Sequence, residues 1–425
     1  MSVIGGRKLR GVTAMLGLVL AVASVAPAEN WPCFRGPTRQ GISHEKSVPL
    51  KWDATTHIAW KTPIPGEGWS SPIVFGDRLF VTTALEGGTS LHLICLDRRT
   101  GKIRWDKEVA RQRAGHKQRS NSYASSTPAT DGQHVYVLAC DGRIAAVSMN
   151  GDTAWINSDF DDYYSEHGIA VSPVLYEDLV IVPYDWSSPG PNKKVGWQIA
   201  WDKAVILAVD KNTGRTRWKG RRGSSRIAHV TPQIAQVDGQ PQLISGAGNV
   251  IQGFDLKNGQ RLWTASSRGE GVVPSVVVGD GLVFTASGFG EPRICVVRLG
   301  GHGDVTASHV VWKSDRDVPM VPSMLYVSPH LYVLADSGVV KCVEAATGKQ
   351  IWKERLRGKF SASPVWAEGR IYFVGEKGTT TVIGAGAKFK VLAENQLDGT
   401  FCASPAISQG HMFLRSDDAL YCIGP

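Results

Sequence analysis

Five polar loops contain the residue types that could bind a ligand or do chemistry. Three of them, GHKQRSNSYASSTP, DFDDYYSEHGIAVSP and SSRIAHVTP, carry more polar groups than a turn requires, and two others, RGEGVVP and GEGWSSP, with Glu67 and Trp69 in the latter, show the same feature more weakly. The candidate ligand-binding side chains are His116, Arg119, Asn121, Glu166, His167, Arg226, His229 and Glu270. Three histidines with nearby acids could hold a metal, although no short-range ligand spacing supports one. The alternative is a polar channel lining filled with water, and the sequence leaves open whether these residues bind a metal.

Each polar loop ends at a proline that opens a β-rich run, and this pattern repeats along the chain. The prolines are Pro72, Pro128, Pro173, Pro232, Pro274, Pro322, Pro364 and Pro405. They define eight units, 41 to 59 residues apart, each with room for four short strands. This period is typical of a β-propeller blade. If the proline opens the same strand in every blade, the polar loops lie on one face, near the central channel.

A second repeated motif, a turn followed by tryptophan, closes most units. It reads LDRRTGKIRW, VDKNTGRTRW, FDLKNGQRLW and VEAATGKQIW. Its Asp can form an Asx turn, and its Gly suits a position with positive φ. The tryptophans are Trp60, Trp105, Trp155, Trp218, Trp263, Trp312 and Trp352. Seven copies around a ring cannot all face one ligand, so we interpret them as structural wedges between blades, each contributing a few kcal/mol.

The two ends of the chain complement each other. Unit seven has Ala393-Glu394-Asn395 where a tryptophan is expected, and unit eight ends without a fourth strand. The segment HIAWKTPIP, with Trp60, belongs to no unit. The sequence therefore predicts an all-β protein, an eight-bladed β-propeller in which the strand at 57–61 completes the last blade. Such closure hides the edges of the sheets.

The start of the chain predicts export. Arg7, Lys8 and Arg10 precede an apolar run and a small-residue cleavage site, which together indicate a signal peptide at 1–28. A lead-in segment follows at 29–56 and the propeller at 57–425. Export to the periplasm or the outside, no membrane span and a monomer are expected. Without the signal peptide the formal charge falls from +9 to +6 and is dispersed, so nucleic acid is not an expected partner.

The seven cysteines do not form an evident disulfide framework. Cys95, Cys342 and Cys422 share one repeat position, which other units fill with Ala or Gly, so we interpret them as buried packing thiols. The pairing of Cys33, Cys140, Cys295 and Cys402 is left open.

Blade three contains an insertion, PYDWSSPGPNKKVGWQIAWDKA. Its three tryptophans, Trp186, Trp197 and Trp201, could present a surface to an envelope protein or a glycan. Alternatively, the loop folds back and buries them.

Taken together, the repeats resemble the pyrroloquinoline-quinone (PQQ) enzyme-like repeats. These repeats form eight-bladed propellers in quinoprotein alcohol dehydrogenases and in the propeller lipoprotein of the outer-membrane assembly machinery. The resemblance covers 57–424, and the opening WPCFRGPTRQGIS is similar to the lead-in of secreted PQQ-like repeat proteins. The fold is implied by this resemblance, whereas the function is not.

The chain departs from both kinds of relative. It has no adjacent cysteine pair, no haem-attachment motif and no lipid-acceptor cysteine at the cleavage point, and no catalytic residue of the dehydrogenases can be carried over. We therefore expect an exported, non-catalytic scaffold or binding propeller that contacts its ligand through the channel-face loops, with neither PQQ nor Ca²⁺ supported by the residues. The alternative is a PQQ- or metal-dependent oxidoreductase acting on alcohols or sugars.

Overall fold

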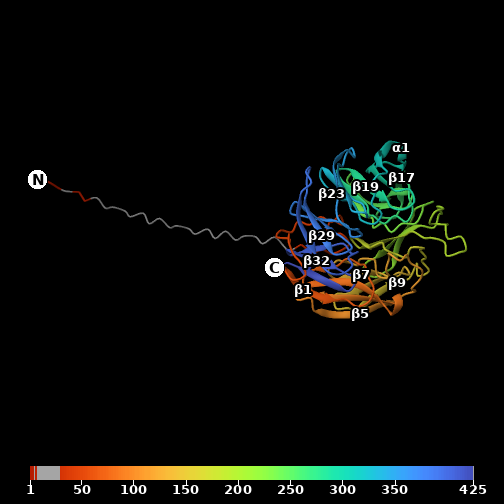
Figure 1. Cartoon of the computed structure of the whole chain (residues 1–425), viewed down its shortest axis with the longest axis horizontal. Helices are drawn as coiled ribbons and strands as arrows, with labels where there is room; N and C mark the ends of the chain where they lie inside the picture. The colour runs from red at the N-terminus through yellow and green to blue at the C-terminus, as the bar shows by residue number, and fades with distance from the viewer. Residues whose placement is uncertain (4, 7–28, 425) are drawn as a thin grey trace.

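The computed structural model describes residues 1–3, 5–6 and 29–424. The predicted signal peptide, 1–28, falls almost entirely outside these residues. Eight antiparallel sheets surround a common centre (Figure 1), and each is one blade of a propeller. The predicted eight-bladed fold is confirmed. None of the helices in the described part of the chain is long and apolar enough to span a bilayer.

The first strand of each blade is short, and in seven of the eight blades it contacts the first strand of a neighbouring blade, so the first strands converge around the channel. Blade one comprises β2 (Ile73–Phe75), β3 (Arg78–Leu85), β4 (Ser90–Asp97) and β5 (Ile103–Arg111), and blade two comprises β6 (Ala129–Thr130), β7 (His134–Leu138), β8 (Ile144–Ser148) and β9 (Thr153–Asn157). Blade three comprises β10 (Val174–Tyr176), β11 (Leu179–Tyr184), β12 (Val205–Asp210) and β13 (Thr216–Arg221). Blade four comprises β14 (Gln233–Val237), β15 (Gln240–Gly246), β16 (Val250–Asp255) and β17 (Arg261–Ser266).

Blades five to eight follow the same order. Blade five comprises β18 (Val277–Gly279), β19 (Leu282–Ser287), β20 (Arg293–Arg298) and β22 (Val310–Ser314), and blade six comprises β23 (Leu325–Val327), β24 (His330–Leu334), β25 (Val339–Glu344) and β26 (Gln350–Arg355). Blade seven comprises β27 (Val365–Ala367), β28 (Arg370–Val374), β29 (Thr379–Gly384) and β30 (Val391–Gln396). Blade eight comprises β31 (Ala406–Ser408), β32 (His411–Arg415), β33 (Ala419–Ile423) and β1 (Ile58–Pro63). Three small elements are additional: β21 (Gly303–Asp304), parallel to β17, the helix α1 (Thr306–His309) and the 3-10 turn η1 (Glu86–Gly88).

The ring closes as predicted. Strand β1 pairs antiparallel with β33, and Trp60 stands opposite Cys422 in this pairing. In Figure 1 the C-terminus lies beside β1 and β32, so both ends of the propeller chain meet in blade eight. Every blade therefore has four paired strands, because β1 supplies the outer strand that the last unit lacks.

The tryptophan of one blade docks on the Asp-Gly turn of the next. Trp60 donates a hydrogen bond from Nε1 to the carbonyl of Arg98 at 2.9 Å. Gly101 of that turn has a φ of 70°, and a Cβ at this position would lie 2.5 Å from the indole. Equivalent bonds join Trp105 to Met149, Trp155 to Lys211, Trp218 to Leu256, Trp312 to Ala345 and Trp352 to Gly386. Six of the seven repeat tryptophans thus join neighbouring blades. Only Trp263 differs among the described repeat tryptophans, because it donates to the Gln242 side chain within its own blade.

The shared cysteine position has a steric cause. Cys95, Cys342 and Cys422 each stand opposite the tryptophan of their blade on the adjacent strand, and all three are buried. A small residue is required here, because a Cβ added at the matching Gly253 would lie 2.1 Å from Nε1 of Trp263. All seven cysteines are free thiols.

Blade seven obtains its missing tryptophan from the lead-in segment. Ala393 occupies the repeat position of the tryptophan, opposite Val382. Trp52, which is only 4% exposed, stacks instead on Tyr372 of this blade, with ring centroids 6.4 Å apart. Asn395 holds the segment in place by accepting a hydrogen bond from the Trp52 backbone at 2.9 Å and donating one to the Leu50 carbonyl at 3.1 Å. The sequence did not reveal this replacement, since Trp52 lies outside every repeat.

The earlier part of the lead-in crosses the channel and closes it. Trp31 bridges to Val74 of blade one, Gln40 accepts a hydrogen bond from Val278 of blade five on the opposite side of the ring, and Ile42 bridges to Trp366 of blade seven. Between them, the buried Arg35 donates to the carbonyl of Met324, next to blade six, at 2.8 Å. Blades two, four and eight are also contacted, through Thr130, Gln233 and Ser408. The lead-in predicted as a separate segment is therefore packed into the propeller.

We predict that Trp52 stabilises the ring as much as a repeat tryptophan does. Removing a buried aromatic side chain costs about 3–5 kcal/mol, so Trp52→Ala and Trp352→Ala should lower the free energy of unfolding by similar amounts. Urea-induced unfolding measures this, with the exposed neighbour Lys51→Ala as the control. If Trp52→Ala were as stable as Lys51→Ala, Trp52 would not take the place of the repeat tryptophan that blade seven lacks.

Candidate functional site

A ring of hydroxyl groups surrounds the channel at the start of the first strands. In seven of the eight steps around the ring, the backbone N–H of a Ser or Thr donates to the hydroxyl of its counterpart in the next blade. The bonds measure 2.9 to 3.1 Å, and the last runs from Ser404 back to Ser71. We call this set the hydroxyl girdle: Ser71, Thr127, Ser172, Thr231, Ser275, Ser323, Ser363 and Ser404. It explains why a small polar residue accompanies the repeat proline.

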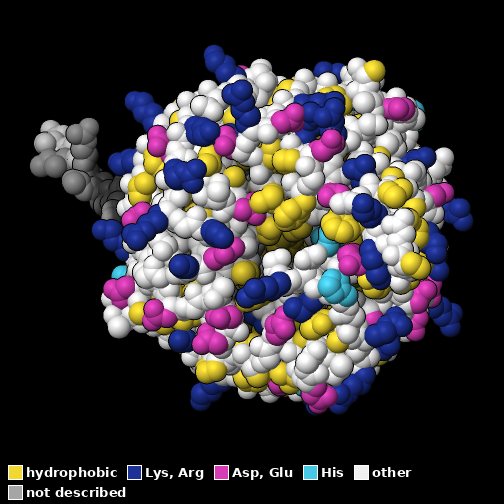
Figure 2. Space-filling view, turned by 45° about the vertical axis from the view of Figure 1, so that its right-hand side comes forward, with side chains coloured by type: hydrophobic (Ala, Val, Ile, Leu, Met, Phe, Trp, Pro, Cys, Tyr) yellow, Lys and Arg dark blue, Asp and Glu magenta, His cyan; other side chains and the backbone are white. Residues whose placement is uncertain are grey.

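Above the girdle the channel widens into a funnel. It is a cavity of about 510 Å³, lined by the girdle and by loops from most of the blades. Most of these loops connect the outer strand of one blade to the inner strand of the next, and the loops that carry Trp197 and Phe289 connect the second and third strands of one blade. Antiparallel pairing places both kinds of loop on the same face. Figure 2 shows a hollow in the middle of the molecule, bordered by hydrophobic and histidine side chains. Phe34 of the lead-in also lines the cavity.

Four of the eight predicted side chains meet in the funnel. Asn121, His167, His229 and Glu270 all line it, although they come from four different loops. The imidazole rings of His167 and His229 lie 5.8 Å apart between centroids. A Cβ on Gly271, the residue after Glu270, would lie 2.9 Å from the His167 ring, so a glycine at this position lets His167 approach the backbone closely.

The other four predicted residues lie outside the funnel. His116 lines a smaller adjacent pocket of about 260 Å³, with its Nε2 3.7 Å from Oε1 of Glu166. Glu166 also accepts a hydrogen bond from the Tyr164 hydroxyl at 2.6 Å. Arg119 is exposed, and Arg226 directs its guanidinium at the Gly269 carbonyl, 3.4 Å away. The predicted set thus joins side chains of the funnel with side chains that lie outside it, in or beside the adjacent pocket or at the surface.

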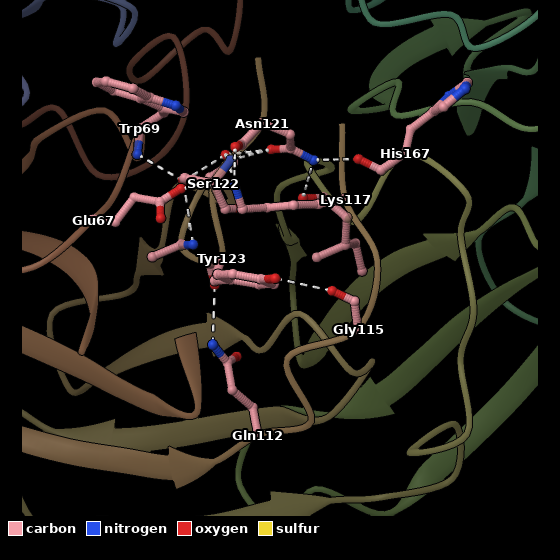
Figure 3. A network of polar contacts seen from close by, with 12 residues as sticks. Glu67, Trp69, Gln112, Gly115, Lys117, Asn121, Ser122, Tyr123 and His167 are labelled. Atoms are coloured by element: carbon pink, nitrogen blue, oxygen red, sulfur yellow. Dashed lines mark hydrogen bonds and ion pairs between the residues drawn. The ribbon is translucent and has the colours of Figure 1, made fainter. Parts of the chain in front are cut away.

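Asn121 organises the wall of the funnel more than it offers free groups to it (Figure 3). Its amide nitrogen donates to the carbonyls of His167 and Ile169, and its oxygen accepts from the Ser122 backbone and the Ser125 hydroxyl. Nearby, Lys117 donates to the Asn121 carbonyl at 2.8 Å and pairs with Glu67 at 3.0 Å. Figure 3 shows how this network joins the loops that carry Glu67, Asn121 and His167, and it thereby fixes the funnel wall across three blades.

His229 differs from every other polar side chain of the funnel. It is 5% exposed, and neither ring nitrogen has a hydrogen-bond partner among the described residues. Burial, with a smaller effect from His167, lowers the pKa of His229 to about 3. Burial also lowers the pKa of His167, although Glu166 partly opposes this. Both imidazoles are therefore neutral at pH 7, and His229 offers one donor and one acceptor that nothing uses.

The donor set in the funnel does not assemble a metal centre. Within 29–424 and the few described residues before them, no group of three or more His, Cys, Asp or Glu side chains is close enough to hold a metal ion. The metal hypothesis required His116, Glu166, His167 and His229 together, but His116 and Glu166 belong to the adjacent pocket and its border.

The aromatic side chains of the funnel were only partly visible to sequence reasoning. Trp197, from the blade-three insertion, reaches the cavity and packs edge-on against His167 at 5.2 Å between centroids. Trp186 and Trp201 instead fold back: the first packs on Phe160 and Tyr163, and the second donates to the Trp186 carbonyl at 2.9 Å. Trp69, Phe289 and Phe34 also line the cavity. Trp69 lies in GEGWSSP, one of the two weaker polar loops, whereas the two phenylalanines were not predicted and no motif marks either of them.

Comparison with known sequences places the repeats in one family. The profile described as outer membrane protein assembly factor BamB, a PQQ repeat family, matches residues 51–246, 192–305 and 247–388. The chain belongs to this family. Its membership confirms the predicted resemblance. No individually curated protein matches the sequence.

Solved structures support the fold at low sequence identity. BamB from Moraxella catarrhalis superposes with a TM-score of 0.57 at 14% identity, over 86% of this chain and 99% of that one. A europium-containing methanol dehydrogenase superposes with a TM-score of 0.52 at 12% identity, over 92% of this chain and 90% of that one. The computationally designed Ika8 protein superposes with a TM-score of 0.58 at 13% identity, over 91% of this chain and 99% of that one. The propeller fold is thus similar to that of an assembly factor, an enzyme and a designed protein, so the fold does not by itself indicate a function.

We predict that His229 makes the stability of this family member depend on pH. The imidazole stays neutral in the fold down to about pH 3, but an exposed histidine protonates near pH 6.5. The unfolded state therefore binds the extra proton in this window, so stability rises with pH and is lost as the pH falls from about 6.5 towards 3. His229→Phe should reduce this slope, by at most about 1.4 kcal/mol per pH unit.

The measurement is urea-induced unfolding across the same pH window. At neutral pH His229→Phe should be at least as stable as the parent, because it removes buried polar atoms without partners. Thr231→Val alters the same wall without removing a titrating group, so it should keep the parent slope. If the free energy of unfolding of His229→Phe depended on pH as steeply as that of the parent, His229 would not be the cause of the pH dependence.

Proposed function

We propose that this protein is an exported, non-catalytic binding propeller that takes a ligand into the funnel. The observation that carries the proposal is the funnel itself, about 510 Å³ in volume, with the buried His229 unpaired in its wall. This volume falls in the range of about 300–1,000 Å³ typical of small-molecule sites. A buried polar atom without a partner costs about 1–3 kcal/mol, and a ligand that bonds it would recover that cost.

The wall suits binding because it is held rigidly. The girdle fixes the base of the funnel, and the Asn121 network ties three of its loops together. The lead-in closes the lower end of the channel, so the funnel has one mouth. A site that is formed before the ligand arrives loses little conformational entropy on binding.

The residues of the funnel do not fit the cofactor of the quinoprotein branch. PQQ carries several carboxylates, yet no Lys or Arg is among the described residues that line the cavity. Glu270 is its one carboxylate, whereas Ca²⁺ takes six to eight oxygen ligands, commonly from several carboxylates. Cys402 is its one thiol and has no adjacent cysteine. These features favour the binding function over the alternative, a PQQ- or metal-dependent oxidoreductase.

Export to the envelope belongs to the same proposal. Its support is the predicted signal peptide at 1–28 together with membership of a family described as an outer-membrane assembly factor. An envelope location brings either a glycan or a macromolecular partner within reach of the funnel face.

A reporter at the mouth of the funnel tests this proposal. Ser120 is exposed at the lining, so Ser120→Cys can carry an environment-sensitive fluorophore. The native Cys140 and Cys402 will label slowly, because burial raises the pKa of each thiol to about 12. The matched control is Lys388→Cys, in the exposed turn between β29 and β30 at the opposite end of the strands. The probes are an aqueous bacterial-envelope extract and, separately, PQQ with Ca²⁺.

We expect the extract to change the fluorescence of the funnel label and not of the control label, and PQQ with Ca²⁺ to change neither. Absence of a response to the extract, or equal responses of both labels, would overturn the binding proposal. Saturable binding of PQQ with Ca²⁺, accompanied by dye-linked oxidation of alcohols or sugars, would establish the oxidoreductase instead.

A further inference from the structure

The base of the funnel offers hydrogen-bond donors that the protein does not use. Seven girdle hydroxyls accept a backbone N–H from the preceding blade. None of these seven donates its own proton to another group in the described part of the chain. Each girdle side chain is at most 5% exposed, so the O–H protons are buried at the bottom of the cavity. A ligand that reaches them must supply acceptor atoms spaced around a ring.

His229 adds both a donor and an acceptor beside the girdle. It lies two residues before Thr231, and both of its ring nitrogens lack a partner although the side chain is more than nine-tenths buried. Because the imidazole is neutral, it can donate to one oxygen and accept from another. A hydroxyl group satisfies either nitrogen, since it is itself both a donor and an acceptor.

Aromatic rings stand around the same cavity. Trp69, Trp197 and Phe289 come from three loops of different blades, and Phe289 is 43% exposed. Such rings offer flat apolar faces, and tryptophan adds a polar N–H at its edge. The cavity thus combines flat apolar surface with a deep ring of hydroxyl and imidazole groups.

The charge of the funnel excludes a strongly anionic occupant. Glu270 is the one charged side chain among the described lining residues, and both histidines are neutral at pH 7. An anion would therefore enter a low-dielectric cavity without a counter-charge. A purely apolar ligand fits no better, because it would leave His229 and the girdle protons unsatisfied.

We infer that the funnel binds an uncharged carbohydrate, a glycan segment whose sugar rings stack on Trp197, Trp69 or Phe289 while its hydroxyls reach His229 and the girdle. This inference rests on the proposed binding function and names its ligand class. Sugar rings have one face of C–H groups and a rim of hydroxyls, and this is the combination that the cavity complements. The Glu270 carboxylate can accept further hydroxyl protons at the wall, so a neutral ligand rich in hydroxyls hydrogen-bonds this charge, whereas an anionic ligand would be repelled by it.

The test begins with an array of neutral and acidic glycans, probed with the full-length mature protein. We expect neutral glycans to bind and their uronic-acid or sulfated counterparts to bind more weakly. The best neutral oligosaccharide is then titrated calorimetrically against the parent and variants. Trp197→Ala removes a stacking face, and His229→Phe keeps the shape of the ring but removes both nitrogens. Each should weaken binding by about tenfold or more, equivalent to about 1.4 kcal/mol.

Trp201→Phe is the matched control, because Trp201 lies in the same insertion but does not line the funnel. It should leave the affinity unchanged. Unfolding curves separate binding from folding: His229→Phe should lose affinity while remaining at least as stable as the parent at neutral pH. A merely structural histidine would not give this combination.

The carbohydrate inference is overturned if no neutral glycan binds, if acidic glycans bind better, or if neither variant weakens binding. The fluorescent label at Ser120 distinguishes this failure from that of the proposed function. A funnel label that still responds to the envelope extract, with no glycan bound on the array, would keep the binding propeller and reject the carbohydrate.

Discussion

The hydrogen bond from a backbone N–H of one blade to the hydroxyl of the next is the contact on which the centre of this molecule depends. The Ser and Thr residues of the girdle are at most 5% exposed, so their backbone N–H groups are buried away from water. Each therefore needs an acceptor. In seven of the eight steps a Ser or Thr hydroxyl of the next blade supplies it, including the step from Ser404 back to Ser71. The same groups form the base of the funnel, so the architecture and the candidate site share their chemistry.

The outer part of each blade is held by a different contact, and the lead-in repairs the one place where that contact is missing. Tryptophans dock on the glycine turn of the following blade, where a side chain in place of the hydrogen would collide with the indole. Blade seven lacks its tryptophan, and Trp52 fills the gap by stacking on Tyr372. The segment that precedes Trp52 also closes the channel. One short stretch thus stabilises the ring and makes a funnel of an open channel.

The funnel retains groups that a structure selected for stability alone would have paired. Neither ring nitrogen of the buried His229 has a hydrogen-bond partner among the described residues, and the seven girdle hydroxyls that accept a bond donate none within that part of the chain. Unsatisfied polar groups of this kind are rare in native interiors and are commonly explained by a function. Related propellers include an assembly factor and an enzyme, so family membership leaves the choice to these side chains. Their neutrality and the aromatic rings above them favour a binding site for a hydroxyl-rich, uncharged ligand.

The fold could be predicted from the sequence because the repeat is local: the turn glycine, the wedge tryptophan and the strand pattern recur within each unit, and counting them also revealed the orphan strand that closes the ring. The presence of polar loops on one face followed from the same repetition. The site itself could not be predicted in the same way. His167 and His229 meet, whereas His116 lines the adjacent pocket with Glu166 beside it, because loop paths between blades depend on long-range contacts such as those of Asn121. Trp52 and Phe34 acquire their roles only when the lead-in packs against blades hundreds of residues away, and only tertiary structure decides such contacts.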